Sequence, residues 1–154
     1  MKFSGEIAVK APRESVFDRV QDARFFASCV EGVRNLVEVT PTRYTARFET
    51  KIAYIRFDFE VVVEVTRAER PHIIEARIEG KPHGIVGRLA ANSSATFTQD
   101  GDDTRIQYAI EASLTGRLGS IGQPVLKSKA KDMERHFVQN MRAAFPGGVA
   151  EPAS

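Results

Sequence analysis

The sequence predicts an α+β fold in which a curved, seven-stranded antiparallel sheet wraps around one long C-terminal helix. Apolar and polar side chains alternate through most of residues 33–114, which is typical of successive half-buried strands. Residues 125–145 contain no proline or glycine and repeat apolar side chains at three- and four-residue spacing, which indicates an amphipathic helix. A single helix that closes a sheet must bury its apolar stripe against one sheet face.

The N-terminal part supplies one strand and two short helices. Residues 2–10 alternate, with apolar side chains or glycine at every second position from Phe3 to Val9. Pro12 then suits the first turn of a short helix, because that turn needs no backbone donor there. A second short helix is predicted over residues 23–28, ending near Gly32. Both helices therefore fall between the first and second strands.

The clearest hairpin joins residues 44–52 to residues 55–65. If Ala53 and Tyr54 form a two-residue turn, Ile52 pairs with Ile55, and both apolar sets fall on one face of the sheet. The same register pairs Thr50 with Phe57 and Phe48 with Phe59. Alanine and tyrosine are poor residues for such a turn, so a bulge is the alternative.

Two more strand pairs can be aligned in the same way, with the apolar side chains of both strands on one face of the sheet. After a turn over residues 67–71, the pattern predicts three pairs: Ile74 with Val65, Ala76 with Val63, and Ile78 with Val61. Residues 100–103, Asp-Gly-Asp-Asp, form a strong turn signal. Around that turn the pattern predicts four pairs: Phe97 with Ile106, Ala95 with Tyr108, Ser93 with Ile110, and Ala91 with Ala112.

The inward face of this last hairpin carries small side chains at Ala91, Ser93, Ala95 and Ala112. They are too short to fill the roughly 10 Å between packed layers. Either large helix side chains reach into this space, or an apolar cavity lies there. We favour the cavity, and a cavity of this kind indicates an apolar ligand.

The closing helix has a predicted sheet-facing stripe of Ile121, Val125, Met133, Phe137, Met141 and Ala144. Lys129 falls on the same stripe, where it either extends outward to solvent or places a charge at the cavity mouth. Residues 116–145 contain six basic and two acidic residues. Such a run is usually a solvated face, but it also suits an anionic membrane surface, where each base contributes roughly 1 kcal/mol.

Composition narrows the class of protein. With 154 residues and a net charge of +2, the chain shows no overall charge bias toward nucleic acid. Cys29 is the only cysteine, which excludes an intrachain disulfide and suits a reducing compartment. The sequence shows no signal-peptide pattern and no apolar stretch of membrane-spanning length. We therefore expect a cytoplasmic protein with one domain over residues 1–145 and a disordered tail over 146–154; peripheral contact with the inner face of the cytoplasmic membrane is an open alternative.

Sites for chemistry are scarce in the sequence. His72, His83 and His136 lie far apart and have no partners at metal-ligand spacing, so we expect no metal. Cys29 has no histidine near it in the sequence. The glycines of residues 116–122 do not have the spacing of a phosphate-binding or dinucleotide-binding loop. We therefore expect no catalytic residues and no cofactor.

The order of the elements resembles the helix-grip fold of the START-like (SRPBCC) superfamily, which includes the birch pollen allergen. Within it, the chain resembles the carbon monoxide dehydrogenase G-subunit family. The resemblance covers roughly residues 1–145, and five segments carry it: Phe3-Ser4-Gly5-Glu6, Ala11-Pro12-Arg13-Glu14-Ser15-Val16-Phe17, Cys29-Val30-Glu31-Gly32-Val33, Thr104-Arg105-Ile106-Gln107-Tyr108, and Leu114-Thr115-Gly116-Arg117-Leu118-Gly119-Ser120-Ile121-Gly122.

This resemblance implies a protein without a catalytic set that binds an apolar molecule between sheet and helix. It also implies association with molybdenum-containing carbon monoxide dehydrogenases or related hydroxylases. The implied roles are enzyme maturation, membrane attachment, or supply of a lipid-like electron acceptor. Glu31 departs from the family pattern, which usually has proline at this position.

We therefore hypothesise non-enzymatic binding of a lipid or quinone-like molecule. The residues expected to line its site are Phe48, Phe57, Phe59, Ile78, Ala91, Ser93, Tyr108, Val125, Met133 and Phe137. Tyr108 is the expected polar contact, because a buried hydroxyl needs a partner.

Two alternatives remain open. The first is an interaction or assembly module that uses its basic helix to contact a redox enzyme and binds no ligand. The second is a cyclase or hydrolase of the same superfamily. That enzyme needs an inward-facing acid–base pair, which the alternation pattern does not supply. An inward Glu, His or Arg beside Tyr108 would favour it.

Overall fold

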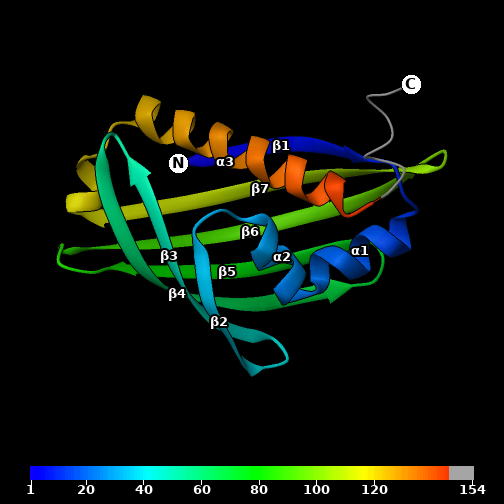
Figure 1. Ribbon diagram of the computed structural model, residues 1–154, viewed down its shortest axis with the longest axis horizontal. Helices are drawn as coiled ribbons and strands as arrows, with labels where there is room; N and C mark the ends of the chain where they lie inside the picture. Colours follow the sequence, from blue (N-terminus) through cyan, green and yellow to red (C-terminus); the bar gives the residue numbers. More distant parts are fainter. Residues whose placement is uncertain (146–154) are drawn as a thin grey trace.

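The computed structural model describes residues 1–145, so the predicted tail over residues 146–154 lies outside the described part. One antiparallel sheet has the strand order β1-β7-β6-β5-β4-β3-β2 (Figure 1). Its strands are β1 (Lys2–Val9), β2 (Val33–Thr40), β3 (Arg43–Ile52), β4 (Ile55–Glu69), β5 (Ile73–Pro82), β6 (Gly87–Asp100) and β7 (Asp103–Gly116). The helices are α1 (Arg13–Gln21), α2 (Ala23–Cys29), the short 3₁₀ helix η1 (Arg117–Ser120) and α3 (Gln123–Ala143).

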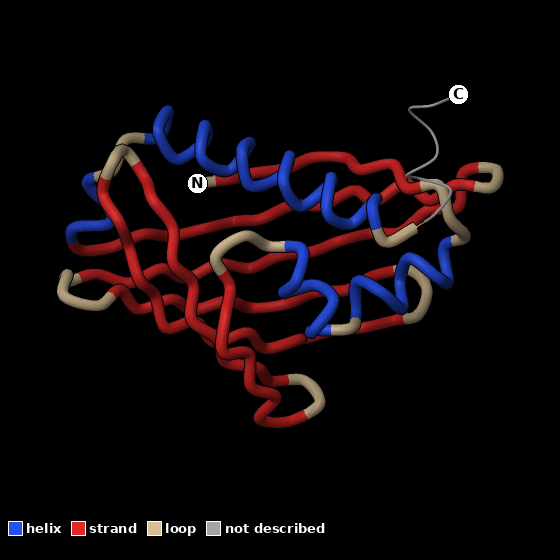
Figure 2. Tube along the Cα trace, viewed as in Figure 1, coloured by secondary structure: helices blue, strands red, loops and turns tan. Residues whose placement is uncertain are grey.

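The three α-helices lie on one side of the sheet, with α3 running alongside β1 and β7 (Figure 2). The predicted helix-grip arrangement is therefore confirmed, including the two short helices after the first strand.

The residues at the helix N-termini explain where two of the helices begin. Asp22 caps α2, because its side chain accepts hydrogen bonds from the backbone N–H groups of Arg24 at 3.0 Å and Phe25 at 3.3 Å. Pro124 occupies the first turn of α3.

The β3–β4 hairpin has the predicted register, with Ile52 opposite Ile55 and Phe48 opposite Phe59. Its two-residue turn uses left-handed backbone at both positions, with φ of 51° at Ala53 and 68° at Tyr54. Both residues are unfavourable in that conformation. The apolar pairing of the strands therefore determines the turn, although the turn residues themselves do not favour it.

The predicted pairing of β4 with β5 is wrong by two residues. Ala76 lies opposite Val65, and Ile78 lies opposite Val63. The cause is that β4 continues to Glu69, with an irregularity between Val65 and Arg67, so the turn is shorter than predicted. A shift of two residues preserves which face each side chain occupies. The predicted pairing of β6 with β7 is confirmed at all four positions.

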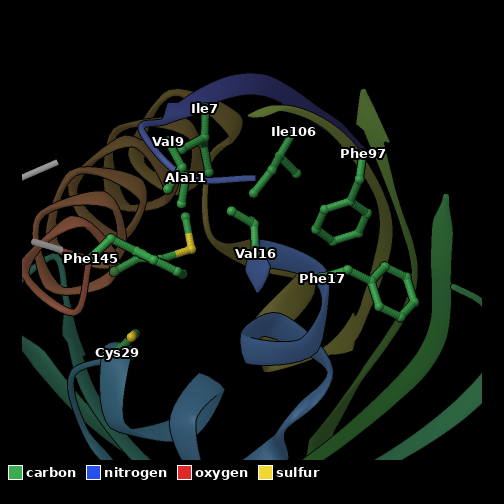
Figure 3. Close-up of a cluster of buried hydrophobic side chains, with 10 residues drawn as sticks. Ile7, Val9, Ala11, Val16, Phe17, Cys29, Phe97, Ile106 and Phe145 are labelled. Atoms are coloured by element: carbon green, nitrogen blue, oxygen red, sulfur yellow. The ribbon is translucent and has the colours of Figure 1, made fainter. Parts of the chain in front are cut away.

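The buried core is divided into two clusters on the helix-covered face. The first cluster joins β1, α1, β6, β7 and the end of α3, and includes Phe17, Phe97 and Met141. Figure 3 shows its side chains converging between the sheet and the helices. The second cluster lies under the β3–β4 hairpin and η1 and consists of Ile52, Phe57, Phe59 and Leu118. Between the clusters, the same sheet face is less completely covered.

Candidate ligand groove

The middle of the covered sheet face lies between the two buried clusters. Its side chains share two properties: cross-strand pairing places them on the same face as the clusters, and they are only half-buried. They are Val63, Ala76, Ile78, Ser93 and Ile110. None of them belongs to either cluster. We call this stretch the groove.

A first hollow of about 610 Å³ lies where the loop after α2, the β3–β4 hairpin and the middle of α3 meet. Val30, Val33 and Met133 provide its apolar part. Gly32 allows the loop to pass closely against β3: its φ is +94°, and an added Cβ would lie 2.1 Å from the backbone oxygen of Glu49. The hollow therefore depends on a position where only glycine fits.

Charged side chains surround this first hollow. Its three acidic residues each have a basic partner: Glu49 pairs with Arg34, Asp132 with Arg135 at 2.9 Å, and Glu31 with His136 at 4.0 Å. The side chains of three lining cations, Lys51, Arg56 and Lys129, form no ion pair or hydrogen bond with any residue of 1–145. The half-buried Lys129 lines this hollow, together with Met133 one turn further along α3.

A second hollow of about 500 Å³ lies beside the first turns of α3. It borders the small residues Ala91 and Ala112 together with Leu114, Leu118 and Leu126. The first hollow adjoins the middle of α3 and the second adjoins its first turns, whereas Met141 near the C-terminal end is completely buried in the first cluster. The helix is therefore packed most closely at its C-terminal end and borders open space along its first and middle turns.

The predicted lining residues do not lie together: the structure distributes them over both clusters, the groove and both hollows, and leaves Val125 exposed. Phe57 and Phe59 are buried in the second cluster, with Phe48 packed against them. Phe137 packs against the first cluster, while Ile78 and Ser93 lie in the groove; Ala91 borders the second hollow and Met133 the first. Val125 does not face the sheet, because it is 39 % exposed and the neighbouring Leu126 takes the inward position of that turn.

Sequence reasoning missed one functional side chain, Glu134. It lies on α3 and accepts a hydrogen bond from the Tyr108 hydroxyl on β7. The stripe proposed for the helix runs from Ile121 through Val125 to Met133, whereas a stripe that begins at Leu126 reaches Ala130 and Glu134 at four-residue spacing. That alternative would have placed a carboxylate on the inward face.

Burial and the neighbouring carboxylate both act on the pKa of Tyr108. Desolvation raises the pKa of Tyr108, and the hydrogen bond to Glu134 and its negative charge raise that pKa further. Gly5 lies opposite Tyr108 on β1, and an added Cβ there would lie 2.4 Å from the Glu134 carboxylate and 2.6 Å from the Tyr108 hydroxyl oxygen. The pair therefore occupies the space that a side chain at position 5 would need.

The sequence pattern of the carbon monoxide dehydrogenase G subunit (CoxG) matches residues 5–145. The chain belongs to this family. Comparison with curated proteins finds no match. The resemblance seen in the sequence is thus confirmed at the level of the family, and CoxG proteins are an accessory-subunit family with a START-like fold.

Solved structures show the same fold. A conserved protein from Geobacillus kaustophilus is 22 % identical, with a TM-score of 0.85 and 94 % of each chain covered. A START superfamily protein from Mycobacterium smegmatis is 12 % identical, with a TM-score of 0.67, covering 93 % of this chain and 95 % of that one. The di-domain ARO/CYC BexL of the BE-7585A biosynthetic pathway is 17 % identical, with a TM-score of 0.59, covering 93 % of this chain and 49 % of that one.

In residues 1–145 of the CoxG-family chain, no three His, Cys, Asp or Glu side chains are grouped so that they could hold a metal ion. Within the same residues, no helix is both long and apolar enough to cross a membrane.

Proposed function

We propose that this CoxG-family chain binds an apolar small molecule, of lipid or quinone type, in the groove between the sheet and α3. The observation that carries the proposal is the division of the core into two clusters with half-buried apolar side chains between them. Ordinary core packing would bury these side chains completely. A ligand in the groove would remove them from water and gain about 25 cal/mol per Å² of apolar surface.

Polar contacts to the ligand would be few. Ser93 lies in the groove, and its hydroxyl makes only a long hydrogen bond of 3.4 Å to the backbone oxygen of Ala76. Tyr108 already donates to Glu134, so it is not free to donate to a ligand. The Glu134 carboxylate still has acceptor capacity, which suits a hydroxyl group on the ligand.

The biological context of this binding follows from the family. We propose that the loaded protein supports a molybdenum-containing carbon monoxide dehydrogenase by maturation, membrane recruitment or delivery of a lipid-like electron acceptor. The family name, which refers to a dehydrogenase component, supports this association. The proposed location is the cytoplasm, with peripheral contact at the inner face of the membrane.

Binding of a short-chain quinone and of an apolar fluorescent dye tests the ligand proposal. Ser93→Phe places a large ring in the groove, whereas Ser94→Phe places the same ring on the opposite face of the same strand. We expect wild type and Ser94→Phe to bind both probes and Ser93→Phe to lose at least tenfold in affinity. Absence of binding by wild type, or equal binding by both variants, would contradict the proposal.

The Tyr108–Glu134 pair favours an enzyme as the second candidate, because it supplies an acid and a hydroxyl on the inward face. The electrostatics oppose this function. A catalytic acid or base works best with a pKa near the working pH, whereas the pKa of Tyr108 is shifted upward, away from neutrality. The pair is better suited to hold the helix on the sheet than to transfer a proton.

A further inference from the structure

The first hollow carries positive charge that residues 1–145 do not neutralise. Its lining includes Lys51 on β3, Arg56 on β4 and Lys129 on α3 (Figure 1). The side chains of these three cations form no ion pair or hydrogen bond in the part of the chain that the structure describes. The three acidic residues that line the hollow are already paired with other basic side chains. The hollow therefore presents three uncompensated positive charges from three different elements.

Two of these cations lie opposite each other across the β3–β4 hairpin. Lys51 is the register partner of Arg56. Like charges at such positions destabilise a sheet, whereas opposite charges stabilise it. The other charged residues of β3 all have partners of opposite charge, namely Arg43 with Glu64 at 3.2 Å, Arg47 with Asp58, and Glu49 with Arg34. The pair of Lys51 and Arg56 is therefore a local cost to stability, which an anion bound between the two side chains would offset.

The size and lining of the hollow indicate the kind of molecule that would bind. Its volume of about 610 Å³ lies within the range of small-molecule sites, roughly 300–1,000 Å³, so it has room for more than a bare ion. Apolar side chains make up only three of its thirteen lining residues. A lining this polar favours a compact polar molecule over the chain of a lipid. Thr50 adds a hydroxyl that has no hydrogen-bond partner among the described residues.

We propose that the first hollow binds a soluble small molecule through a phosphate monoester group held by Lys51, Arg56 and Lys129. Such a group carries a charge of about −1.5 to −2 at pH 7, which matches three uncompensated cations better than the single charge of a carboxylate does. Arginine can bind two phosphate oxygens at once, and lysine adds a point charge. The Thr50 hydroxyl can donate a further hydrogen bond. This site goes beyond the proposed function, because its ligand is anionic and none of the groove residues lines the hollow.

Isothermal titration calorimetry with phenyl phosphate, benzoate and phenol tests the site. The three probes share one ring and differ in charge. We expect phenyl phosphate to bind with a Kd below about 1 mM, benzoate to bind about tenfold more weakly, and phenol not to bind. The affinity for phenyl phosphate should fall as the salt concentration rises. No binding of phenyl phosphate, or binding of benzoate or phenol that equals it, would overturn the proposal.

Removal of the two hairpin cations tests which residues hold the phosphate. Lys51→Gln with Arg56→Gln should lower the affinity for phenyl phosphate by about tenfold or more. The matched control is Lys127→Gln with Arg88→Gln, which removes one lysine and one arginine from exposed positions that line neither hollow. Its affinity should stay within about twofold of wild type. Equal losses in the two double variants would show that only the overall charge matters, and would overturn the site.

Thermal unfolding in the absence of ligand gives a second readout. Lys51→Glu turns the like-charge pair with Arg56 into a pair of opposite charge, so the thermal midpoint should rise by about 1–4 °C. The same substitution should abolish measurable binding of phenyl phosphate. A gain in stability together with a loss of binding is the result expected for cations that serve a ligand. An unchanged or lower midpoint would overturn the claim that these two cations repel each other.

Two further probes separate this site from a lipid site and from the groove. Dihexanoyl phosphatidic acid carries the same phosphate monoester on a lipid body, and it should bind no more tightly than phenyl phosphate. Binding that is tighter by about tenfold or more would assign the phosphate to a lipid headgroup and overturn the soluble ligand. The short-chain quinone should still bind Lys51→Gln with Arg56→Gln, and phenyl phosphate should still bind Ser93→Phe. Failure of one proposal can therefore be distinguished from failure of the other.

Discussion

The hydroxyl of Tyr108 on β7 donates a hydrogen bond to the carboxylate of Glu134 on α3, and thereby ties the closing helix to the sheet beside the first core cluster. The bond lies over Gly5, whose missing side chain makes room for it. It joins the two layers that bound the proposed groove, namely α3 and the sheet at β7.

Replacing Tyr108 with phenylalanine should destabilise the fold by about 1–3 kcal/mol, because the half-buried Glu134 would lose its partner. Urea denaturation measures this loss as a lower free energy of unfolding. The control is Tyr44→Phe, which removes a hydroxyl bonded to the Pro41 oxygen at an exposed loop. Its effect should stay below about 1 kcal/mol. Equal effects of the two substitutions would count against a special role for the Tyr108–Glu134 bond.

The stability of the fold should also depend on this pair at alkaline pH. Burial and Glu134 raise the pKa of Tyr108 in the folded protein, whereas the unfolded chain has the ordinary tyrosine value of about 10. The unfolded state therefore releases its proton first, so the stability from the protonated hydroxyl is complete below about pH 10 and is lost as the pH rises above that value. Unfolding measured from pH 8 to pH 11 should show a steeper decline for wild type than for Tyr108→Phe. Parallel declines would contradict the assignment.

Adding one methyl group at Gly5 should disrupt the same contact from the β1 side. An alanine Cβ would lie 2.4 Å from the Glu134 carboxylate, so the carboxylate and the Tyr108 ring must move. We expect Gly5→Ala to lower the thermal midpoint by several degrees, which corresponds to about 1–3 kcal/mol. Gly122→Ala is the matched control, because its Cβ would meet only the Pro124 ring at an ordinary 3.7 Å. The same loss in both would show that steric conflict is not the cause.

The β3–β4 turn should be open to stabilisation. Ala53 and Tyr54 both have positive φ, in which residues other than glycine and asparagine are strained by about 1–2 kcal/mol. The double substitution Ala53→Asn with Tyr54→Gly supplies the preferred turn residues and should raise the free energy of unfolding by about 1 kcal/mol. No change in chemical denaturation would mean that the surrounding strands already relieve the strain.

The fold could be predicted from sequence because the alternation of apolar and polar residues along each strand shows which face a side chain occupies. The same alternation limits which residues of two neighbouring strands can pair. The β3–β4 and β6–β7 registers follow from it, since a slip of one residue would expose every apolar side chain. The β4–β5 register did not follow, because β4 continues to Glu69 and an irregularity lies after Val65; together they move the partners by two residues and leave the faces unchanged. Local patterns do not record such a shift.

The candidate site was less predictable, because it depends on how far the helix rotates on the sheet. A stripe read from Val125 and one read from Leu126 differ by a single position, yet only the second brings Glu134 inward.

Native mass spectrometry of gently purified protein, followed by solvent extraction, tests the central claim most directly. The proposed groove predicts an apolar molecule bound at up to one per chain in wild type and in Ser94→Phe, and absent from Ser93→Phe. Extraction should then identify it as a lipid or quinone. A wild-type protein that carries no apolar molecule, and takes up none when lipid or quinone is supplied, would contradict the account.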